Sequence, residues 1–74
     1  MTRLEMEIIG AESEVERLTA GMEKAVALLK EALNDDLTNE GYRNTFIARS
    51  EDVRRCVEAV IGAKKLLEKL EGLQ

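Results

Sequence analysis

The chemically reactive side chains of this chain are few and scattered. Its 74 residues include 15 acidic side chains and one cysteine, Cys56, but no histidine. A thiolate nucleophile needs a neighbouring base, and acid–base catalysis needs carboxylates gathered in a cleft that shifts their pKa values. The sequence has no Gly-rich phosphate loop and no Ser-His-Asp set, and its carboxylates spread over the predicted solvent faces of helices. We therefore expect a protein that is not an enzyme.

The single cysteine also limits how so short a chain can be held together. One cysteine cannot form a disulfide within the chain, and without histidine it cannot complete a zinc site. Small domains often need such a cross-link, a metal or a partner. We expect no metal and no cofactor, so regular helix packing, self-association or a protein partner must supply the stability. Cys56 itself is interpreted as a small core residue.

Charge and hydropathy exclude further classes of function. The net charge is −4, whereas a nucleic-acid-binding surface is typically basic. No apolar run is long enough to span a membrane. The first residues, MTRLEMEIIGAESE, are acidic and amphipathic, unlike a secretory signal. We expect a cytoplasmic protein, in keeping with an unpaired cysteine.

The first half of the chain has the apolar rhythm of a long helix that packs against another helix. Apolar residues recur at alternating spacings of four and three, without interruption, over four heptads. A strand would instead alternate with a period of two. The series predicts a helix over about residues 2–33, and its members are Leu4, Ile8, Ala11, Val15, Leu18, Met22, Ala25, Leu29 and Ala32.

The second half repeats the rhythm, with Arg49 as its only charged member. Thr38 is a favourable N-cap type, and Leu37 with Tyr42 has the spacing of a hydrophobic staple. These signals predict a tight turn at about residues 34–37 and a second helix over about residues 38–71. The alternative is a long loop with the second helix starting at Ser50. The series runs through Tyr42, Phe46, Arg49, Val53, Cys56, Val60, Ala63, Leu67 and Leu70.

Two long helices joined by a short turn make an antiparallel two-helix hairpin, so we predict one all-α, coiled-coil-like domain over residues 1–74. Folding the two series together predicts that Ala11 faces Val60 and that Arg49 lies beside Met22. Arg49 could turn its charge outward, set the register or pair with a partner. Acidic residues early in the first helix would face basic residues late in the second. The predicted seam comprises Leu4, Ile8, Val15, Leu18, Leu29, Tyr42, Phe46, Val53, Val60 and Leu67.

A two-helix seam does not use all the apolar residues of this chain. Val26, Leu33 and Val57 are interpreted as flanking the seam. A surplus on an outer face is typical of an interaction surface. Gly10 and Gly62 are expected on outer faces, where they would either admit a close partner or simply be tolerated. The candidate partner-binding residues are Ile9, Ile61, Leu66 and Leu73.

Several short stretches resemble the YscE family of type III secretion needle co-chaperones. The first five residues read MTRLE, and Ala27-Leu28-Leu29-Lys30 follow in the first helix. The turn then leads to Gly41-Tyr42-Arg43 and to the second helix with its stretch over residues 50–61. The similarity extends over nearly the whole chain, and the length agrees.

The resemblance implies a small helical protein that pairs with a larger TPR-like chaperone. Together the two would keep the needle subunit monomeric in the bacterial cytoplasm, and the small member would form a homodimer when alone. Two alternatives follow from the residues themselves: a homodimeric four-helix-bundle adaptor, or a small regulatory protein that binds a partner's groove.

Overall fold

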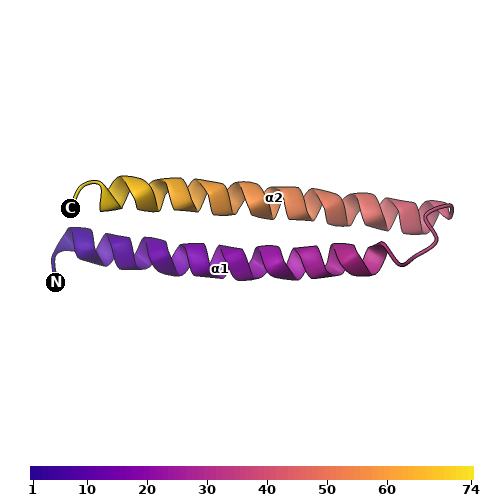
Figure 1. Cartoon of the computed structure of the whole chain (residues 1–74), viewed down its shortest axis with the longest axis horizontal. Helices are drawn as coiled ribbons and strands as arrows, with labels where there is room; N and C mark the ends of the chain where they lie inside the picture. The colour runs from indigo at the N-terminus through magenta and orange to yellow at the C-terminus, as the bar shows by residue number, and fades with distance from the viewer.

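The computed structural model describes residues 1–74 as two long helices lying side by side and antiparallel (Figure 1). Helix α1 spans Arg3–Ala32 and helix α2 spans Glu40–Glu71. The molecule measures 56 × 15 × 12 Å, and both termini lie at the end opposite the turn. The predicted all-α hairpin is confirmed.

Helix α1 begins with a side-chain cap and ends in a polar turn. The Thr2 hydroxyl oxygen accepts a hydrogen bond from the Glu5 backbone N–H at 3.1 Å, which satisfies a donor that has no partner within the helix. At the other end the backbone N–H groups of Leu33 and Asn34 donate to carbonyls of the last turn. The helix therefore stops where the sequence changes from apolar periodicity to Asn34-Asp35-Asp36.

The N-cap of α2 is Asn39, one residue after the predicted Thr38, and the helix itself begins at Glu40 instead of at about residue 38. The Asn39 side-chain oxygen accepts from the backbone N–H groups of Gly41 and Tyr42, at 2.9 and 3.4 Å. Thr38 is already engaged, because both its N–H and its hydroxyl donate to the Asp36 carboxylate. These two hydrogen bonds lower the pKa of Asp36. The alternative start at Ser50 is wrong, since Ser50 lies well inside α2.

Very little of the hairpin is buried. Only Ile8, Ala25, Ala32 and Val60 lose nearly all their exposure, and all four belong to the two predicted series. A seam between two helices is open on both sides, so most of its members remain in partial contact with water. Seven residues of the predicted seam are half-buried: Leu4, Val15, Leu18, Leu29, Phe46, Val53 and Leu67.

The register between the helices differs from the predicted one by roughly one heptad. Ala11 lies beside Leu66 and Leu70 instead of facing Val60. Arg49 likewise lies beside Leu28 and Ala32 instead of Met22. The 4–3 rhythm repeats every seven residues, so sliding one helix by a heptad again sets apolar residues against apolar residues. Periodicity alone could not choose between these registers.

The shifted register explains the one predicted seam residue that lies outside the seam. Helix α2 starts beyond the C-terminal end of α1, so its first turn has no neighbouring helix (Figure 1). Tyr42 is in that turn and its exposure is 48%. The hydrophobic pairing expected of Tyr42 across the seam is therefore wrong, because α1 has already ended at this level.

Each of the five ion pairs joins two residues of the same helix that are three or four positions apart. The expected attraction between early α1 carboxylates and late α2 cations forms no ion pair across the seam. Exposed pairs of this kind contribute about 0.3–0.5 kcal/mol each. They support the individual helices, whereas apolar contact along the seam joins one helix to the other.

Candidate interaction surfaces

The four candidate partner-binding residues all project into solvent. The exposure of Ile9 is 49%, of Ile61 48%, of Leu66 55% and of Leu73 70%. Five further large apolar side chains are also exposed, which makes nine against four buried residues in the whole chain. These five are Met1, Met6, Leu33, Tyr42 and Ile47.

One side of the hairpin carries two hollows between the helices, with volumes of about 440 and 290 Å³. Glu7 lines the first and Leu28 the second, three heptads further along α1. Leu66 and Thr45 have the same separation on α2. Residues at heptad spacing lie on the same side of a helix in such a pair, so the two hollows share one face. We call this the grooved face.

The other side of the hairpin has a different set of apolar residues. Glu7 directly precedes the buried Ile8 and points to the grooved face, so Ile9, which directly follows Ile8, points to the opposite side. Ile61 follows the buried Val60 in the same way. Each member of this second face directly follows a residue of the 4–3 series. We call it the isoleucine face, and its members are Ile9, Val26, Leu33, Ile47, Val57 and Ile61.

The structure therefore places the three candidates that lie within the helices on two different faces. Leu66 lies on the grooved face, Ile9 and Ile61 lie on the isoleucine face, and Leu73 lies beyond the end of α2. Ile61 and Leu66 are only five residues apart, but five residues rotate a helix by about 140° beyond one full turn. No single flat partner surface could cover all four, and treating them as one patch overlooked this difference.

The larger hollow of the grooved face is open and uncharged at its floor. A Cβ atom added to Gly10 would have no neighbour within 4 Å, and Ala11, Leu66 and Leu70 supply the apolar lining. The rim carries two carboxylates, each with an arginine neighbour on α1. Arg3 lies 3.5 Å from Glu7, and Arg17 bonds Glu14 and lowers the pKa of that carboxyl.

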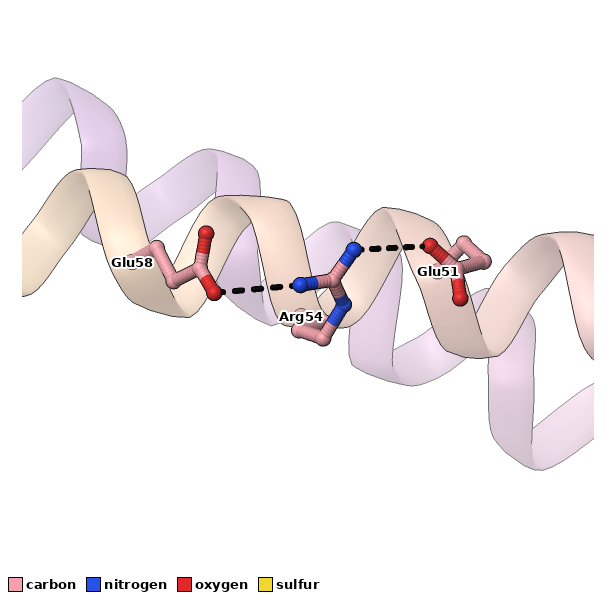
Figure 2. Close-up of polar contacts among 3 residues, drawn as sticks. All are labelled: Glu51, Arg54 and Glu58. Atoms are coloured by element: carbon pink, nitrogen blue, oxygen red, sulfur yellow. Dashed lines mark hydrogen bonds and ion pairs between the residues drawn. The ribbon is translucent and has the colours of Figure 1, made fainter.

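The isoleucine face includes one charged cluster on α2. Arg54 directly follows Val53 of the 4–3 series, so it lies in the same stripe of α2 as Ile47, Ser50, Val57 and Ile61. Figure 2 shows its guanidinium between two carboxylates, with Glu51 at 3.0 Å and Glu58 at 3.2 Å. Both contacts raise the pKa of Arg54. All three side chains are at least half exposed, so the pairs can exchange with water or with a partner's carboxylate.

Arg49 and Cys56 differ from ordinary core residues in distinct ways. Arg49 lines the smaller hollow beside Leu28 and Ala32, and one of its guanidinium nitrogens lies 4.0 Å from Asp52. Its side chain is thus partly covered while its charge stays near solvent. Cys56 is a free thiol and is only half-buried.

The chain has no concentration of reactive groups beside these surfaces. No three histidine, cysteine or acidic side chains gather in a way that could hold a metal ion. The two carboxyls with a lowered pKa, Glu14 and Asp36, are exposed and each has an identified partner. Neither helix is long and apolar enough to cross a membrane. What the arrangement offers is apolar helix surface in two separate stripes.

Comparisons with known proteins return no match among family models, curated proteins or solved structures. The resemblance to the needle co-chaperones therefore rests on the short stretches of this sequence.

Proposed function

We propose that this chain is a non-enzymatic binding protein that packs its outer helix faces against other helices. The observation that carries this proposal is the excess of exposed over buried apolar side chains. The chain exposes 5573 Å², whereas a compact protein of its mass, 8.3 kDa, would expose about 4,600 Å². The difference, roughly 1,000 Å², is comparable to the 800 Å² or so that one partner buries in a stable interface.

Within this class, we propose a co-chaperone of a type III secretion system. It would pair with a larger TPR-like chaperone and help keep the needle subunit monomeric in the bacterial cytoplasm. The sequence resemblance supports this assignment through the MTRLE start, the Ala27–Lys30 stretch and the Gly41-Tyr42-Arg43 stretch. A helical-repeat partner would also supply the long, closely spaced helices that an elongated two-helix surface can pack against.

The grooved face is the proposed docking side for that larger chaperone. Its hollow between Gly10, Leu66 and Leu70 can take a large apolar side chain from a partner helix. Gly21 and Gly62 belong to this same face by heptad and helical spacing, and a Cβ at either would meet nothing within 4 Å. An interior helix glycine costs about 1 kcal/mol relative to alanine, so close approach of another helix would account for keeping three of them.

The decisive experiment purifies the tagged protein from its own cells and measures, by mass spectrometry, which proteins co-purify in stoichiometric amounts. The proposal expects a helical-repeat protein together with a small needle-like subunit. Leu66→Asp should remove both, and Ile61→Asp, an equally drastic change on the other face of the same helix, should retain them.

Two results would contradict the proposal. Recovery of the tagged chain alone would favour the adaptor alternative. Loss of the co-purifying proteins with Ile61→Asp but not with Leu66→Asp would show that the partner docks on the isoleucine face and not on the grooved face. Circular dichroism of both variants checks that the hairpin remains helical.

A further inference from the structure

Helix α1 carries different charges on its two outer sides. On the side of the grooved face, acidic and basic residues are equal in number: Arg3, Glu7, Glu14, Arg17, Lys24 and Glu31. On the side of the isoleucine face, all but one of the charged residues are acidic: Glu5, Glu12, Glu16, Glu23 and Lys30. Negative charge is therefore concentrated along one edge of one face of the hairpin.

The four glutamates of this edge, which we call the acidic row, have no counter-charge within α1. All four are exposed, and none takes part in the five ion pairs. By contrast, Glu7 and Glu14 on the grooved side each pair with an arginine of the same helix. The ion pairs of α1 thus neutralise the grooved side and leave the other side negative.

Helix α2 does not supply the missing counter-charge either. Its side of the isoleucine face has basic and acidic residues in equal number: Glu40, Arg43, Arg54, Lys64, Glu68 and Glu71. Arg54 is held between Glu51 and Glu58, and no ion pair joins α2 to α1 (Figure 2). The acidic row is therefore open to cations of another molecule.

Nearer the turn, the isoleucine face is apolar. Leu33 and Ile47 are exposed, and they lie at nearly the same level because their neighbours Ala32 and Thr45 line one hollow. The Ser50 hydroxyl donates to the Phe46 carbonyl at 3.0 Å, so it requires no partner from an occupant. We call this part of the face the apolar strip, and its members are Val26, Leu33, Ile47 and Val57.

We propose that the isoleucine face binds a basic amphipathic helix of a protein other than the partners proposed for the grooved face. The apolar side of that helix lies over the apolar strip, and its Lys or Arg side chains face the acidic row. Glu5 and Glu12 are seven residues apart, as are Glu16 and Glu23. A helix packed nearly parallel to α1 therefore meets them with cations that recur every seven residues along one flank. An anionic membrane surface is repelled by the same row.

A synthetic peptide tests this proposal with purified components. The part of α1 between Glu16 and Leu33 is about 25 Å long, so a dye-labelled helical peptide of about 20 residues can cover it. The probe has Leu at 4–3 spacing and Lys at every seventh position of one flank, and its control has Glu in place of each Lys. Fluorescence anisotropy should show that the lysine peptide binds about tenfold more tightly than the glutamate peptide, and that added salt reduces the difference.

Two double variants locate the cations of the bound peptide. Glu16→Gln with Glu23→Gln should weaken binding of the lysine peptide about fivefold. Glu7→Gln with Glu14→Gln removes the same charge from the grooved face and should change it little. Equal effects of the two double variants would show that only the overall charge matters and would overturn the proposal.

A matched pair of single variants tests the apolar strip. Ile47 and Leu66 have nearly the same exposure, 53% and 55%, and lie on different faces of α2. Ile47→Ser should weaken binding of the lysine peptide, whereas Leu66→Ser should not, and circular dichroism checks that both variants remain helical. No binding of the lysine peptide to the unchanged protein, or equal binding of the two peptides, would overturn the proposal. Self-association of the unmixed chain that Ile47→Ser abolishes, with peptide binding unchanged, would assign the strip to a second copy and also overturn it.

Discussion

The seam and the outer faces of this hairpin contain the same kinds of residue, but these residues have different roles. Ile8 and Val60 are buried between the helices, whereas Ile9 and Ile61, the very next residues, are half exposed. One step along a helix turns a side chain by about 100°, and that rotation alone separates a residue that joins the helices from one that meets another molecule. Hydrophobicity by itself therefore does not reveal the role of a residue in this chain.

The largest difference should appear between two adjacent isoleucines. Ile8→Ala removes a buried side chain from a thin seam and should lower the free energy of unfolding by about 2–4 kcal/mol. Ile9→Ala, changed in the same way one residue later, should alter it by less than about 0.5 kcal/mol in dilute protein. Urea unfolding followed by circular dichroism measures both. Equal losses would show that the isoleucine face belongs to the core of the single hairpin.

The cap of α2 provides a second test of what holds the hairpin together. Asn39→Ala removes the acceptor for the Gly41 and Tyr42 N–H groups and should cost about 1 kcal/mol of stability. Thr38→Ala is the matched control, and it should cost less because Thr38 bonds only the exposed Asp36. Thermal unfolding of the two variants compares them. A larger loss of stability for Thr38→Ala would show that Thr38, the N-cap predicted from the sequence, is the residue that caps α2.

Gly10 allows the grooved face to be changed without touching the seam. Gly10→Ala adds a methyl group where no atom lies within 4 Å, so it should stabilise the isolated hairpin by up to about 1 kcal/mol. The same methyl group narrows the hollow and should weaken partner binding. Unfolding and co-purification assays of this variant should thus move in opposite directions, and stronger partner binding would count against the grooved face as the docking side.

The smallest expected effect is the pH dependence of the turn. The Thr38 hydrogen bonds lower the pKa of Asp36, so their stabilising contribution is present above the ordinary carboxyl pKa and is lost as pH falls through the lowered one. Asp36→Asn should abolish this part of the acid sensitivity. Melting temperatures measured over a series of acidic pH values test it, and identical profiles for the two proteins would contradict the assigned cause.

The sequence predicted the helices well because their evidence is local and repeated. Nine residues in the 4–3 rhythm define α1, and the same rhythm carries α2 through Phe46 and Arg49, where a loop was the alternative. The N-cap was misplaced by one residue, because Thr38 and Asn39 have similar capping preferences. In the structure Thr38 donates to the Asp36 carboxylate, whereas the Asn39 side chain accepts from the first N–H groups of α2.

The register and the division of the outer surface could not be predicted in the same way. A heptad repeat is unchanged by a shift of seven residues, so Tyr42 looked like a seam residue although it lies past the end of α1. Leu66 and Ile61 both looked like surplus apolar residues. Assigning them to two faces required the position of each helix relative to the other, which the hollows supply.

The central claim is that the exposed helix faces are association surfaces and that the seam alone gives only a marginal fold. The most direct test is the thermal unfolding midpoint of the purified chain measured over a wide range of protein concentration. Association of folded chains stabilises them by mass action, so the midpoint should rise steadily with concentration. A midpoint that stays constant over the whole range would show a self-sufficient monomer and would contradict the account.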